Sequence, residues 1–77
     1  MGRRFPAVTA RQLLRVLHGL GFRLARQAGT SHAVYRRESD GRRTVVPVHE
    51  GTILKRRTLG AILDDCGLTL ERFRSLL

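Results

Sequence analysis

Two turn sequences divide the middle of the chain into three short extended segments. Ala28-Gly29-Thr30 separates residues 22–27 from residues 31–37, and Ser39-Asp40-Gly41 separates the latter from residues 43–48. Asp and Gly tolerate positive φ angles, so the second turn favours a tight hairpin. The last segment is rich in β-branched residues, which suit strands. This pattern predicts three antiparallel strands.

A helical pattern precedes the strands. Thr9 and Gln12 have the spacing of a capping box, in which each side chain binds the other residue's backbone amide. Apolar residues between positions 13 and 20 then recur with roughly helical period. Gly19 and Gly21 follow, and either one can end the helix in a left-handed conformation. We therefore expect a first helix that is capped by Thr9.

Two further helices are expected after the strands. Thr58 is the predicted N-cap of a second helix that Gly67 ends, and Thr69 is the predicted N-cap of a short third helix. The order α-β-β-β-α-α predicts an α+β fold, with a three-stranded antiparallel sheet and helices packed on one face. The other face is left to solvent or a ligand. We interpret residues 1–77 as one domain.

The charge of the chain narrows the classes of partner that it is expected to bind. Its 15 basic and 6 acidic residues give a net charge of +9 in 77 residues, and every basic residue except Lys55 is arginine. Such a surface attracts polyanions, of which nucleic acid is the commonest, and the planar guanidinium fits phosphate oxygens. Cys66 is the one cysteine, which suits a reducing cytoplasm. No apolar run is long enough to span a membrane, so we expect no membrane partner.

Metal and cofactor motifs are missing from the sequence. The three histidines, His18, His32 and His49, are scattered and lack the spacing of paired ligands. Asp64 and Asp65 are neighbours that point about 100° apart on a helix, so they do not converge on one ion. There is no glycine-rich nucleotide-binding motif. We therefore expect no metal and no small-molecule cofactor.

His32 is the candidate catalytic residue. It follows the Gly29-Thr30-Ser31 turn and, by strand alternation, shares a face with Arg36. A histidine beside arginines on an open sheet face could meet an RNA phosphate and the adjacent 2′-OH. On the residues alone, however, one histidine is a weak signal. A surface histidine that hydrogen-bonds to the turn is then the favoured interpretation.

Several short segments recur along the chain in an order and spacing that resemble those of the HicA toxin family, also described as YcfA-like. The segments that carry this resemblance are Leu13, Leu14 and Leu17, Gly21-Phe22, Arg26-Gln27, Gly29-Thr30-Ser31-His32, Val45-Val46-Pro47-Val48-His49, Thr58-Leu59-Gly60-Ala61-Ile62-Leu63, Cys66-Gly67-Leu68 and Phe73.

The resemblance implies a fold like that of double-stranded-RNA-binding domains. It also implies a toxin of a type II toxin-antitoxin system, an mRNA interferase that a HicB antitoxin inhibits. The histidine of the Gly-Thr-Ser-His motif is catalytic in that family, which corresponds to His32. Many members carry Lys or Arg just before the motif glycine, whereas this chain has Ala28 there.

The resulting prediction is a cytoplasmic endoribonuclease that needs no metal. His32 takes the proton of a ribose 2′-OH, and arginines stabilise charge on the phosphate. His49, Tyr35 and water remain candidates for the general acid. The predicted RNA-binding residues are Arg26, Gly29, Thr30, Ser31, Arg36, Arg37, Lys55, Arg56 and Arg57.

Two alternatives remain open at this point. One is a non-catalytic RNA-binding module with the same fold. The other is a DNA-binding repressor, which is less favoured because the sequence has no convincing helix-turn-helix.

Overall fold

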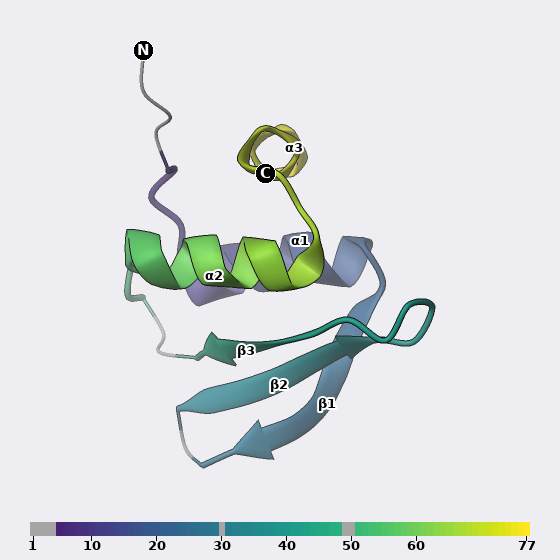
Figure 1. Ribbon diagram of the computed structural model, residues 1–77. Coiled ribbons are helices and arrows are strands. Elements are labelled where there is room, and N and C mark those ends of the chain that lie inside the picture. Colours follow the sequence, from purple (N-terminus) through teal and green to yellow (C-terminus); the bar gives the residue numbers. More distant parts are fainter. Residues whose placement is uncertain (1–4, 30, 49–50) are drawn as a thin grey trace.

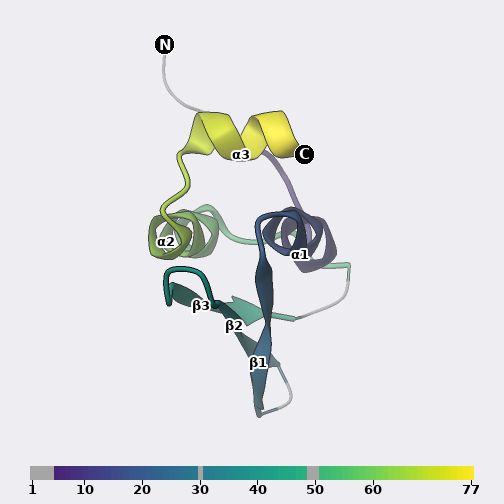
Figure 2. The ribbon, with the colours of Figure 1, turned by 90° about the vertical axis from the view of Figure 1, so that its right-hand side faces the viewer.

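Three layers make up the computed structural model, which describes residues 5–29, 31–48 and 51–77. A three-stranded antiparallel sheet forms one layer, two helices side by side cover one of its faces, and a short third helix lies outside those two (Figures 1 and 2). The fold is α+β and resembles double-stranded-RNA-binding domains, as expected. The elements are α1 (Ala10–Gly19), β1 (Phe22–Ala28), β2 (His32–Arg37), β3 (Arg43–Pro47), α2 (Arg56–Cys66) and α3 (Leu70–Leu76).

The ends of α1 and α3 follow the predicted local signals. The Thr9 side chain accepts a hydrogen bond from the Gln12 amide at 3.2 Å, and Gln12 Oε1 accepts one from the Thr9 amide at 2.8 Å. Thr69 caps α3 by accepting from the amide three residues later at 3.1 Å. Gly21 and Gly67 follow α1 and α2 with φ angles of 97° and 67°, which glycine adopts without strain. These predictions are confirmed.

The predicted start of α2 was wrong. The helix begins at Arg56 with Lys55 as its N-cap, and it has no side-chain cap, whereas Thr58 lies inside the first turn. The preceding segment is held by tertiary contacts, because the Leu54 amide donates to the Val8 carbonyl at 2.8 Å. That contact fixes where the chain enters the helix, so the local preference of threonine for a cap does not decide the boundary.

β1 contains an irregularity that changes which side chains face outward. The strand order is β1-β2-β3, and the register between β1 and β2 shifts between Leu24 and Arg26. Ala25 is therefore an extra residue, as in a β-bulge, and Arg26 pairs with Val34 in its place. Because paired residues lie on the same face, the bulge puts Arg26 on the face that carries Val34.

The core lies between the sheet and the two helices that cover it. Phe22 is fully buried there, whereas Leu24, on the same face of β1, is 53% exposed. Both views show the β1–β2 hairpin extending away from the helices, which leaves the outer part of β1 uncovered (Figures 1 and 2). The largest fully buried side chains are Phe22, Phe73, Leu13, Leu17, Leu59, Ile62 and Val46.

Candidate active site and nucleic-acid interface

The sheet face that is turned away from the helices carries His32 and a set of arginines. We call it the open face, and cross-strand pairing defines its members, since paired residues share a face. From the start of β2 to its end, three rows cross this face: His32 and Pro47; then Arg26, Val34 and Val45; then Arg23, Arg36 and Arg43.

Arginines dominate the two rows beyond His32. Arg26, Arg36 and Arg43 are exposed. Arg36 pairs with Glu38 at 2.9 Å, but the two side chains are 46% and 93% exposed, and such solvent-exposed pairs are weak enough to exchange for a phosphate. Arg23 instead donates to the His18 carbonyl at 3.0 Å, at the end of α1. Sequence reasoning missed Arg43, although its place opposite Arg36 follows from counting through the hairpin turn.

His32 is exposed, and its surroundings hold it at the start of β2. Its Nδ1 atom lies 3.2 Å from the Ser31 hydroxyl, and its carbonyl accepts a hydrogen bond from Gln27 Nε2 at 3.2 Å. The Ser31 carbonyl accepts from the Val48 amide at 2.8 Å, which extends the β2–β3 ladder by one bond. The backbone on both sides of the imidazole is thereby fixed, and the ring faces solvent.

His32 also lines a cavity of about 410 Å³, which we call the His32 cavity. The start of β2, the end of β3 and the start of α2 meet at this end of the molecule (Figure 1). The residues that line it are His32, Val45, Pro47, Thr52, Ile53, Leu54, Lys55 and Thr58. The fold therefore brings the predicted residues His32 and Lys55 to one site, although they are distant in sequence.

The start of α2 adds positive charge beside this cavity. Lys55, Arg56 and Arg57 are all exposed, and the first turn of α2 holds no acidic residue. The N-terminus of a helix carries a partial positive charge of its own, so this end of α2 favours an anion. Gly29 is exposed in the turn between β1 and β2. Thr30 and His49, which the sequence also suggested, lie outside the described residues.

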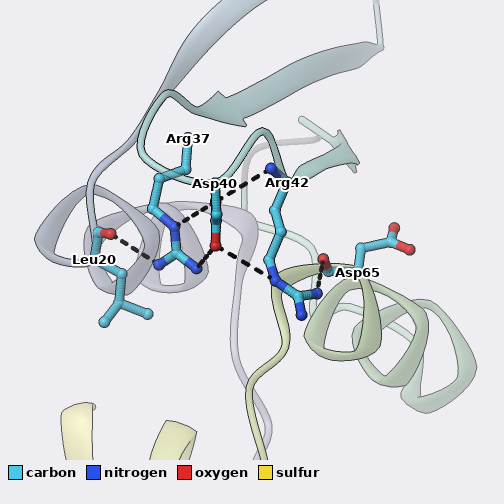
Figure 3. A network of polar contacts seen from close by, with 5 residues as sticks. All are labelled: Leu20, Arg37, Asp40, Arg42 and Asp65. Atoms are coloured by element: carbon cyan, nitrogen blue, oxygen red, sulfur yellow. Dashed lines mark hydrogen bonds and ion pairs between the residues drawn. The ribbon is translucent and has the colours of Figure 1, made fainter.

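The structure gives Arg37 a different environment from the other predicted RNA-binding residues. Its guanidinium lies over the Phe22 ring at 4.6 Å and donates to the Leu20 carbonyl at 3.0 Å. It also donates to both carboxylate oxygens of Asp40, at 3.1 and 2.8 Å (Figure 3). These contacts occupy the donors that a phosphate would need. We therefore leave Arg37 out of the RNA surface proposed below.

Tyr35 also lies away from His32. It is 8% exposed and belongs to the core cluster, with its ring centroid 6.0 Å from that of His18 on α1. Neighbouring positions on β2 alternate between faces, so Tyr35 points towards the helices and His32 to the open face. The Tyr35 hydroxyl is therefore not placed to act together with His32.

A polar network joins the β2–β3 hairpin to the ends of both covering helices (Figure 3). Arg42 contacts Asp40 at 3.5 Å and donates to the Asp65 carbonyl at 3.1 Å, near the end of α2. The buried Thr44 hydroxyl donates to the Asp65 carboxylate at 2.8 Å. The hydrogen bond from Arg37 is the main reason that the pKa of Asp40 is lowered to about 2. This network orients the hairpin that carries Arg36 and Arg43.

The described part of the chain holds neither a metal-binding cluster nor a helix that could span a membrane. No group of three His, Cys, Asp or Glu side chains there is arranged to hold a metal ion. Cys66 is a buried core residue, as expected, and burial raises the pKa of its thiol to about 11. No helix among residues 5–29, 31–48 and 51–77 is long and apolar enough to cross a membrane.

A comparison with protein-family models identifies the chain. The model described as the HicA toxin of bacterial toxin-antitoxin systems matches residues 10–68, from the start of α1 to the loop after α2. The chain belongs to the HicA toxin family. This confirms the resemblance seen in the sequence, and it gives the chain a toxin role in partnership with an antitoxin. The match to the HicA model spans all three strands and His32. Curated protein sequences gave no match.

Proposed function

We propose that this HicA toxin is an endoribonuclease that cleaves mRNA with His32 as its general base. His32 takes the proton from a ribose 2′-OH, and the oxygen attacks the adjacent phosphorus. The bond to the 5′-oxygen of the next nucleotide breaks, and a 2′,3′-cyclic phosphate remains on the upstream product. One observation carries the proposal: the exposed imidazole shares a cavity with Lys55 and opens onto a sheet face lined with arginines.

Ser31 is placed to orient the imidazole. If its hydroxyl accepts a hydrogen bond from Nδ1–H, the other ring nitrogen, Nε2, is unprotonated and can take a proton. The backbone of Ser31 is itself anchored to β3 through the Val48 amide. In this tautomer Nε2 is the atom that acts as the base.

Positive side chains near the cavity stabilise the phosphate as it gains negative charge. Lys55 lines the cavity itself, while Arg56 and Arg57 follow it in the exposed first turn of α2. Arg26, Arg36 and Arg43 extend the basic surface along the open face. Fixed positive groups at the place where charge develops are an effective means of lowering the barrier.

The described residues narrow the choice of general acid. Tyr35 faces the core, so it does not protonate the leaving 5′-oxygen. The side chain of His32 is exposed, which lets water reach the leaving oxygen. Water and His49 therefore remain the candidates.

We further propose that the antitoxin is a HicB-like protein and that it covers β2. A +9 toxin surface favours an acidic partner face, and opposite potentials speed encounter. Hydrogen exchange tests this proposal. We expect the partner to protect the β2 amides between His32 and Arg37. Protection confined to α1 or α2, with His32 still open to RNA, would show that the antitoxin acts from the helical side.

Replacement of His32 tests the catalytic proposal. We expect His32→Ala to abolish RNA cleavage and growth arrest, because the proposed mechanism uses this imidazole as its base. The variant should stay folded, since exposed substitutions change stability by less than about 0.5 kcal/mol. The matched control is His18→Ala, which removes another exposed histidine and should cleave normally. A folded His32→Ala protein that cleaves RNA at the parent rate would refute the role of His32. If the parent protein binds RNA but does not cleave it, the chain is better described as a non-catalytic RNA-binding module.

A further inference from the structure

The His32 cavity has walls that suit more than a phosphate. Four of its residues are apolar, namely Val45, Pro47, Ile53 and Leu54. Val45 and Ile53 are 42% and 51% exposed and both line this cavity, so they present apolar surface beside its charged residues. Catalysis by His32 and charge stabilisation by Lys55 do not use these apolar groups.

We propose that the His32 cavity holds one nucleobase, from a nucleotide beside the cleaved phosphate, and selects among bases there. This inference rests on the proposed function, since it places the scissile phosphate at His32. A base is joined to its phosphate through one ribose. With the phosphate between His32 and Lys55, which both line the cavity, the base of that nucleotide falls against the same walls.

The size of the cavity fits a single small ligand. Its volume of about 410 Å³ lies in the lower part of the range of roughly 300–1,000 Å³ that is usual for small-molecule sites. Proteins that recognise RNA by sequence commonly take unstacked bases of single strands into such places, where the flat faces meet side chains. A duplex keeps its bases stacked, so the preferred substrate is single-stranded.

The register of the sheet supplies one wall of this base site. His32 pairs with Pro47, and Val45 follows two residues away on the same open face of β3. Val45 is therefore a diagonal neighbour of His32, roughly 7–8 Å away across the strand pair, and it places an apolar side chain beside the imidazole. Ile53 and Leu54 reach the cavity from the segment before α2.

Two hydroxyl groups give the cavity a means of discrimination. Thr52 and Thr58 both line it, and a hydroxyl either donates or accepts a hydrogen bond. The edges of the four bases differ in their donors and acceptors. A base that leaves a buried partner unpaired binds less well, because an unsatisfied polar group costs free energy. The cavity thus recognises one flanking base, whereas the arginines on the open face bind any sequence.

Cleavage of a matched set of RNAs tests the proposal. Each single-stranded RNA carries one of the four bases at one of the two positions that flank a single cleavable linkage. With the parent protein, we expect kcat/KM to differ by ~10-fold or more between the best and worst base at one position, as pocket discrimination commonly does. The variants Val45→Phe and Ile53→Phe fill the cavity, so that a base no longer enters it. In each of them, the ratio of kcat/KM between the best and the worst base should fall below ~3-fold. Leu24→Phe is the control, since Leu24 is an exposed apolar residue on β1 and does not line the cavity.

A binding measurement keeps the two proposals distinguishable. Each nucleoside 3′-monophosphate is added to the parent protein while the methyl resonances of Val45 and Ile53 are followed by NMR. We expect saturable shifts for both, which differ among the four nucleotides, and no shift for the Leu24 methyls.

Each outcome decides something different. Cleavage that depends on His32 but shows no base preference, or a preference that survives Val45→Phe, overturns the base site and leaves the ribonuclease proposal intact. If the parent cleaves no RNA, the ribonuclease proposal fails, and the methyl shifts alone decide whether the cavity holds a base. If the methyl resonances shift when the antitoxin is added but shift with none of the four nucleotides, the cavity receives a protein side chain. That result also overturns the proposal.

Discussion

Arg36 and Arg37 are adjacent in the sequence but serve different parts of the molecule. Arg36 lies on the open face, where its pair with Glu38 is exposed to solvent. Arg37 lies on the helix side and is held by Asp40, the Leu20 carbonyl and the Phe22 ring. Alternation along β2 accounts for the difference. One arginine remains available to a ligand, and the other holds the hairpin to α1.

Asp40 gives the Arg37 network a measurable pH dependence. Hydrogen bonding to Arg37 lowers the pKa of the Asp40 carboxyl from 3.8 to about 2 in the folded protein. A group with a lowered pKa adds stability above its unfolded pKa and loses it as the pH falls towards the folded value. We therefore expect the free energy of unfolding to fall more between about pH 6 and about pH 2 in the parent than in Asp40→Asn.

Urea denaturation at the two pH values measures this difference. Glu38→Gln serves as the control, because it removes a carboxylate of the same hairpin whose pair with Arg36 is exposed. It should behave like the parent. Equal acid losses in the parent and in Asp40→Asn would show that the Asp40 ion pair contributes nothing to stability.

At the scale of elements, the sequence predicted what local signals determine. The capping box at Thr9, the cap at Thr69 and the closing Gly67 are each encoded within a few residues, and the structure confirms them. The start of α2 depends instead on the contact of Leu54 with Val8, which no local pattern reports. The bulge at Ala25 was missed for the same reason, because pairing with β2 creates it.

The candidate site shows the same limit. The residues alone made His32 a candidate but favoured a surface role, and the resemblance to the HicA family then implied that it is catalytic. The His32 cavity joins the start of β2 to the segment before α2. Residues that are so distant in sequence become neighbours only through the packing of the elements. The residues that line the cavity could therefore not be predicted from the sequence. The cross-strand pairing of Arg36 with Arg43 could have been predicted from the sequence, since the turn between them fixes the register of the two strands.

On the scale of the whole molecule, the open face and α3 lie on opposite sides of the helical layer (Figures 1 and 2). We expect RNA to bind the open face. The double variant Arg36→Ala/Arg43→Ala should therefore flatten the log–log dependence of RNA affinity on salt by roughly one to two units, since about 0.7 of a counterion is released per phosphate contact on single strands.

The matched control for this measurement removes the same charge from the opposite side. Arg72→Ala/Arg74→Ala changes two exposed arginines of α3 and should leave the salt slope unchanged. Equal flattening by both double variants would mean that net charge, and not the open face, governs RNA binding.

Cleavage chemistry provides the most direct test of the central claim, that His32 activates a ribose 2′-OH without a metal ion. The measurement uses an RNA in which the cleaved linkage follows a single 2′-deoxyribose, in excess EDTA, beside the all-ribose RNA. We predict that the all-ribose RNA is cut to a 2′,3′-cyclic phosphate end and that the deoxy linkage stays intact. Cleavage of the deoxy linkage at the same rate, or activity that EDTA abolishes and Mg²⁺ restores, would contradict the account.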